Sequence, residues 1–244
     1  MSSSVKKHTA IQTILFHLLP GLVQLAVFIL LIPVALRFGF NSYFADHLGT
    51  YASMVPIQIG ILLFIAKKTT GTYKITELMP FLEKSKLTEY LLFMVIIFIW
   101  ALCVNAIFSP LENGLRDGLF SFVTDSIAMR DTDVFMIDKS KLVISACLGI
   151  LTNGIVAPVT EELYFRGYLL PRINASPIMA VVVSAGLFSL YHFFSPWYFF
   201  SRVFMMIPLY YWVIKRKNIR FSIMAHVVAN VFASTYVLIE ILRL

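Results

Sequence analysis

Residues 154–177 read GIVAPVTEELYFRGYLLPRINASP, an acidic pair and an arginine set in a long apolar run. Glu161 and Glu162 stand side by side, and Arg166 follows four residues after the second acid. An ionised side chain in the hydrocarbon core of a bilayer costs at least ~2.5 kcal/mol on insertion scales, so such residues are rare and usually functional. The pair therefore predicts a functional site inside a membrane, with partners elsewhere in the chain.

The composition indicates a membrane protein. Of the 244 residues, 59% are hydrophobic and 14% are charged, and the mean hydropathy is +0.83. A soluble domain is about 45–50% apolar and about 25% charged. We expect an all-α, polytopic transmembrane helix bundle, one domain over 1–244 with about seven spans, six to eight being compatible with the length. The expected spans are 11–36, 48–66, 88–108, one from Leu142 into the acidic motif, 177–194, 198–214 and 221–242.

The basic residues orient these spans. The net charge of +7 lies mostly in short segments between apolar runs, which is typical of a positive-inside signal and argues against a nucleic-acid partner. The tail, the 67–86 loop, the 166–172 turn and the 215–220 loop are expected on one side. The 37–47 and 109–141 loops are expected on the other. The pattern predicts an integral protein of the cell membrane with a cytoplasmic N-terminus.

Helix geometry separates the roles of the two acids. Glu162 and Arg166 are four residues apart, so they share a helix face and are expected to form an ion pair. Glu161 points about 100° away and is expected to face a cavity. A continuous helix from Leu142 to Arg172 would be ~46 Å long, too long for a core of about 30 Å. Gly154 and Pro158 are the expected break.

Two further pairs of residues interrupt the last apolar runs. Phe188 and His192 are four residues apart, and so are His226 and Asn230. Measured from the turn at 174–177, Glu161 and His192 would lie at similar depths, ~20 Å and ~22 Å. His226 would lie nearer the cytoplasmic surface, ~9 Å after the basic loop. The groups are expected to meet around a cavity open to the cytosol.

These residue types favour hydrolysis. A carboxylate and an imidazole can hold a water molecule and take its proton. A second imidazole and an amide can stabilise an oxyanion. Phe188 is expected to serve packing. Arg202 is expected to snorkel to the outer interface, with a place in the cavity lining as the less favoured alternative. Tyr210 is expected to belong to the core and interfacial belt.

Three motifs in register resemble one family. EELYFR at 161–166 matches EExxxR, FSLYH at 188–192 matches FxxxH, and HVVAN at 226–230 matches HxxxN. Together, over residues 142–242, they resemble the CPBP family of CAAX prenyl proteases and bacterial Abi-type homologues. The resemblance implies a glutamate-dependent intramembrane endopeptidase.

On that pattern, each motif has a role. Glu161 and His192 would activate water, and His226 and Asn230 would form the oxyanion hole. Glu162 and Arg166 would shape the site. The expected substrate is a membrane-associated peptide, either a prenylated CAAX-type tail or a leader peptide.

No cofactor or metal is expected, because the chain lacks HExxH spacing; zinc is the alternative. Cys103 and Cys147 form no metal-binding spacing. Two other functions stay open: a non-catalytic immunity or scaffold protein of the same fold, and a proton-coupled transporter. A transporter is the less favoured, because we find no internal repeat and few polar residues in the first half. The oligomeric state is not indicated.

Overall fold

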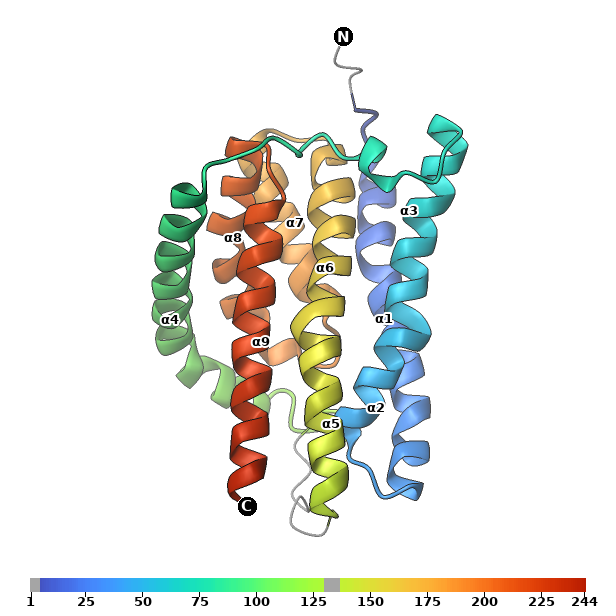
Figure 1. Cartoon of the computed structure of the whole chain (residues 1–244), viewed down its shortest axis with the longest axis vertical. Helices are drawn as coiled ribbons and strands as arrows, with labels where there is room; N and C mark the ends of the chain where they lie inside the picture. Colours follow the sequence, from blue (N-terminus) through green and yellow to red (C-terminus); the bar gives the residue numbers. More distant parts are fainter. Residues whose placement is uncertain (1–4, 130–136) are drawn as a thin grey trace.

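The fold was obtained as a computed structural model that describes residues 5–129 and 137–244. These residues form helices joined by turns, with an isolated bridge between Leu82 and Asn218. The longer helices run roughly side by side (Figure 1). The α-helices of the described residues are α1 Ala10–Arg37, α2 Ser42–Gly49, α3 Val55–Thr70, α4 Leu87–Asp117, α5 Lys139–Leu151, α6 Ala157–Glu161, α7 Pro177–Tyr191, α8 Phe199–Arg216 and α9 Arg220–Arg243.

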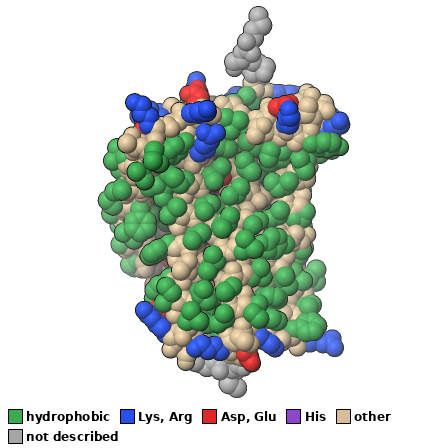
Figure 2. All heavy atoms as spheres, viewed as in Figure 1, with side chains coloured by type: hydrophobic (Ala, Val, Ile, Leu, Met, Phe, Trp, Pro, Cys, Tyr) green, Lys and Arg blue, Asp and Glu red, His purple; other side chains and the backbone are tan. Residues whose placement is uncertain are grey.

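The bundle has the dimensions of a membrane domain. Among the described residues, five helical runs are long and apolar enough to cross a bilayer: Ala10–Arg37, Ser42–Thr70, Leu87–Asp117, Lys139–Arg172 and Arg220–Arg243. The surface in view is a broad hydrophobic band, with Lys and Arg side chains gathered at its two ends (Figure 2). The prediction of an all-α transmembrane bundle is confirmed.

The two remaining predicted spans are α7 and α8, which pack against each other as a hairpin. The 15 residues of α7 rise only ~22 Å, less than the thickness of a hydrocarbon core. The chain turns back after Tyr191 through a 3₁₀ segment at Pro196–Tyr198. This places His192, which follows α7 directly, inside the bundle.

The expected break at Gly154 and Pro158 is wrong. The chain stays helical from Lys139 to Arg172 and passes through a π-helical segment at Thr152–Val156. A proline ring clashes with the carbonyl four residues earlier, and for Pro158 that residue is Gly154. The wider π turn accommodates this clash without ending the helix. The π segment Thr50–Met54 precedes Pro56 in the same way.

The predicted loop at 37–47 is also largely wrong, because α2 begins at Ser42. The side chain of Asn41 caps it by accepting a hydrogen bond from the Phe44 backbone N–H at 3.0 Å, a favoured N-cap arrangement. The helix continues into the second membrane run. Asp46 and His47 therefore lie in the bundle rather than at its surface.

The four basic segments meet at one end, as predicted. Lys7 donates hydrogen bonds to the carbonyls of Pro171 and Ile173 at 2.9 and 3.3 Å. Arg172 donates to the carbonyl of Leu78 at 3.0 Å. The Glu83 N–H donates to the carbonyl of Lys217 at 2.9 Å, which joins the remaining loop to this end.

The expected 109–141 loop is shorter than predicted, because α4 continues to Asp117. Residues 118–129 form turns. The predicted loop residues Arg130, Asp131 and Asp133 lie outside the described residues.

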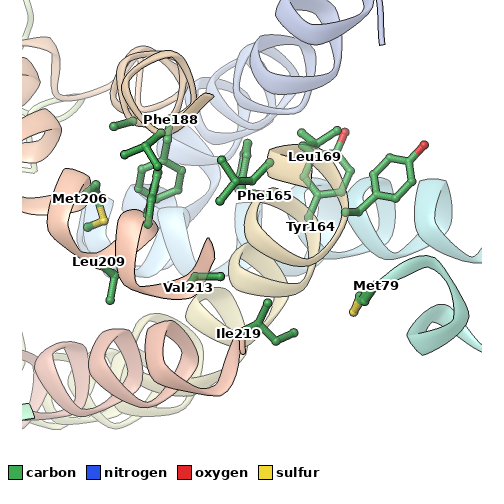
Figure 3. Packing of buried hydrophobic residues seen from close by; sticks show 14 of the residues in the cluster. Met79, Tyr164, Phe165, Leu169, Phe188, Met206, Leu209, Val213 and Ile219 are labelled. Atoms are coloured by element: carbon green, nitrogen blue, oxygen red, sulfur yellow. The ribbon is translucent and has the colours of Figure 1, made fainter. Parts of the chain in front are cut away.

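An aromatic core joins the middle elements. Phe165, from the π-helical segment Glu162–Leu169, lies 5.1 Å from Phe188 and 5.0 Å from Tyr191 between ring centroids. Figure 3 shows Phe165, Phe188 and residues of α8 pointing into one cluster. This core supports the hairpin that carries His192.

Candidate active site

The second acid of the motif is fully buried and ion-paired. Glu162 and Arg166 have 0% exposed surface, and Nε of Arg166 lies 3.1 Å from Oε2 of Glu162. The predicted pair is therefore present. Sequence spacing missed a third member: Nδ1 of His226 lies 2.9 Å from Oε1 of the same carboxylate. Glu162 thus joins its own helix to α9.

The guanidinium of Arg166 is held between two aromatic rings. Its carbon lies 4.0 Å from the ring centroids of both Phe188 and Tyr210, a cation–π arrangement. The same group donates hydrogen bonds to the Tyr210 hydroxyl and to the Met206 sulfur at 3.5 Å. Phe188 therefore packs, as expected, but against a charge. Tyr210 belongs to the core, as expected, and it also supports the site.

Glu161 faces a cavity, as helix geometry predicted. The cavity has a volume of about 410 Å³ and is also lined by His192, His226 and Asn230. Oε1 of Glu161 lies 3.9 Å from Nε2 of His192, and Oε2 lies 3.9 Å from Nε2 of His226. These separations exceed a hydrogen bond but suit a bridging water molecule. The carboxylate therefore lies between two imidazoles.

The backbone fixes the tautomer of His192. Its Nδ1 lies 2.9 Å from the carbonyl oxygen of Phe188. A carbonyl can only accept, so Nδ1 must carry the proton. In the neutral ring Nε2 then has the free lone pair, and this nitrogen faces Glu161. His192 is therefore oriented as a proton acceptor.

His226 and Asn230 lie one turn apart on α9, and both line the cavity. The Asn230 amide donates a hydrogen bond to the Asn153 carbonyl at 2.9 Å, which ties it to the π segment Thr152–Val156. The prediction that His226 lies nearer the surface than the two acids is wrong, because His226 lies beside both of them. The reason is that the chain segment around Phe81 covers the start of α9. Ile219 is 2% exposed, and its N–H donates to the Phe81 carbonyl at 3.0 Å.

Several cavity residues were not predicted from the sequence. Asp46 of α2, Asn105 of α4 and Asn153 all line the cavity, so the first half of the chain does contribute polar groups. Asn105, a lone amide in an apolar run, was an available signal. Asp46 was hidden because its segment was interpreted as a loop. Arg202 also lines the cavity, so its predicted snorkelling to the interface is wrong.

The side chains of the site can be compared with those that a bound metal ion would need. Among the described residues, no group of three or more His, Cys, Asp or Glu side chains is arranged to hold a metal ion. In the site, one ring nitrogen of each histidine is engaged, by the Phe188 carbonyl in His192 and by Glu162 in His226. The other ring nitrogen of each histidine, Nε2, lies 3.9 Å from the Glu161 carboxylate.

Fold and site together define an integral membrane protein with a glutamate–histidine site buried among its helices. Residues 143–232 match the family model described as type II CAAX prenyl endopeptidase Rce1-like. This region of the chain, which holds all three motifs, is therefore similar to the CAAX prenyl endopeptidases. No curated protein and no solved structure matches the chain.

Proposed function

We propose that this protein is an intramembrane endopeptidase that hydrolyses a peptide bond of a membrane-associated peptide, of the prenylated CAAX type. The observation that carries the proposal is the placement of Glu161 between two imidazole nitrogens, 3.9 Å from each, in a cavity inside the bundle. The family match supports the reaction class. Catalysis is expected at the cell membrane, with the basic end of the bundle in the cytosol.

The proposed attack uses one water molecule. The water lies between Glu161 and His192 and gives up a proton to this pair as its oxygen attacks the scissile carbonyl carbon. A tetrahedral oxyanion forms, the C–N bond breaks, and the proton passes to the leaving amine. One water is consumed for each bond cleaved, and no serine or cysteine nucleophile takes part.

His226 and Asn230 are proposed to stabilise the oxyanion. Because Nδ1 of His226 donates to the Glu162 carboxylate, Nε2 can donate only when the ring is doubly protonated. The Asn230 amide retains one N–H beyond its bond to Asn153, because a side-chain amide has two.

The test is hydrolysis of a fluorogenic S-farnesyl peptide by the purified protein in lipid vesicles, beside the unprenylated peptide. Glu161→Gln should lower kcat/KM by about 10²–10⁴-fold, the usual contribution of a general base. Glu240→Gln is the control, because that acid lies near the chain end and pairs only with Arg243 in the described structure. Full activity in Glu161→Gln would refute the mechanism. A chelator in the same assay decides between free and metal-bound water.

A further inference from the structure

Arg202 is a cation that the proposed hydrolysis does not use. It is the only Lys or Arg among the described residues that line the cavity of Glu161. Its guanidinium donates hydrogen bonds to the Ser189 carbonyl at 3.2 Å and to the Ser195 hydroxyl at 2.9 Å. These two residues flank His192 in the chain. The cation is therefore held rigidly beside the hairpin end that carries the imidazole.

The guanidinium lacks a close acid. Within the described chain, no carboxylate oxygen lies within 4.0 Å of it, and its electrostatic interactions with acids reach Glu161 and Glu112 only at longer range. A guanidinium has five N–H donors, and the two hydrogen bonds to serines leave others available. A cation in a membrane interior without a direct counter-ion is costly. A ligand carboxylate in the cavity would supply that counter-ion.

We propose that Arg202 binds the C-terminal carboxylate of the substrate peptide and so selects peptides whose chain ends shortly after the scissile bond. This inference rests on the proposed function. The planar guanidinium matches a carboxylate through paired N–H donors. Binding the chain end beside His192 would place the preceding peptide bonds near Glu161. An internal peptide segment has no charge to offer at this position.

A purely structural role for Arg202, clamping the turn around His192, gives different results. The test uses two dansyl peptides that both end in S-farnesyl-Cys-Val-Ile-Met, one with a free carboxylate and the other with a carboxamide. Wild type should cleave the acid with a kcat/KM roughly 10- to 100-fold higher, the range expected for hydrogen bonds to a charged group. Arg202→Gln should bring the ratio of kcat/KM for the acid to kcat/KM for the amide down to about 1, whereas loss of a purely structural clamp would lower both values and keep the ratio. Arg202→Lys should retain part of the preference for the acid, because lysine keeps the positive charge but lacks the paired N–H donors of the guanidinium.

Two results would overturn the proposal. One is equal cleavage of acid and amide by the wild type, which needs no variant. The other is an acid preference that survives in Arg202→Gln. A binding experiment separates this proposal from the proposed function: the affinity of both peptides for the Glu161→Gln protein is measured by dansyl anisotropy. If the wild type cleaves neither peptide, the proposed function fails, and a tighter affinity for the acid that Arg202→Gln removes would still support the carboxylate site.

Discussion

At the residue scale, the two adjacent glutamates differ in their surroundings. The Glu161 side chain makes no direct hydrogen bond in the described structure and faces the cavity, whereas the Glu162 side chain is fully buried against Arg166 and His226. Removing one partner of a buried ion pair leaves an uncompensated charge, at a cost of about 3–5 kcal/mol. We therefore expect Glu162→Gln to lower the free energy of unfolding by about that amount.

Thermal unfolding in detergent checks this expectation. The melting temperature of Glu162→Gln should fall clearly below that of wild type, while Glu161→Gln should melt within a degree or two of it and lose only activity. Equal melting temperatures for the two variants would mean that the burial of Glu162 has been assigned wrongly.

Tyr210 gives a second prediction at this scale. Tyr210→Phe keeps the ring that stacks on Arg166 and removes the hydroxyl that accepts its hydrogen bond. Hydrogen bonds to charged groups contribute about 1.5–3 kcal/mol, so the variant should be destabilised by that amount. Tyr211→Phe is the matched control, since Tyr211 is 42% exposed. The prediction fails if both variants unfold at the same temperature.

Much of the site at this scale was predictable. The i,i+4 spacing predicted the Glu162–Arg166 pair and left Glu161 facing the cavity. The contact of His226 with Glu162 was not predictable, because the depth of α9 depends on the contact of Ile219 with Phe81. These two residues are far apart in the sequence. Arg202 was misassigned for a related reason: its position near the start of an apolar run does not reveal that α7 and α8 turn back inside the bundle.

At the element scale, the π segment Thr152–Val156 holds α9 in place. A Cβ on Gly154 would lie 3.0 Å from a Val231 methyl and 3.4 Å from the Val231 Cα. Gly154→Leu should therefore push α9 away and move His226 and Asn230, with an overpacking cost of typically 1–3 kcal/mol. Activity should fall by at least tenfold.

The control for this element is Gly60→Leu in α3, where an added Cβ would meet nothing within 4 Å. The two variants are compared by peptide hydrolysis and by thermal unfolding. If Gly154→Leu is as active as Gly60→Leu, close packing of the π segment against α9 is not required by the site.

The elements themselves were predictable to different degrees. Apolar run lengths located all seven expected helical segments. They did not show that Pro158 and Pro56 would be accommodated by π turns, because the sequence rule for proline predicts only a kink or a break. They also missed α2, whose capping residue Asn41 was interpreted as part of a turn.

At the scale of the whole molecule, the basic tail and three basic segments form one end of the bundle. The positive-inside rule predicts that this end faces the cytosol. Cys103 and Cys147 are first replaced by Ala, because both are exposed. A single cysteine is then introduced at Ala175, at the basic end, or at Gly118, at the other end.

In intact cells, a membrane-impermeant maleimide should label Gly118→Cys and leave Ala175→Cys unlabelled until the membrane is opened. The reverse pattern would invert the topology and place the basic end outside. Labelling at both positions would indicate a mixed orientation.

The central claim is that a water molecule held by Glu161 and His192 attacks the scissile carbonyl inside the bilayer. The most direct measurement is a high-resolution structure of the wild-type protein in a lipid nanodisc with a peptide whose scissile amide is replaced by a hydroxyethylene isostere. We predict that the isostere hydroxyl lies within hydrogen-bond distance, about 2.6–3.2 Å, of Nε2 of His226 or of the Asn230 amide, with Glu161 and His192 on the attacking side. An isostere bound outside the cavity, or with Glu161 turned away from the tetrahedral carbon, would contradict the claim.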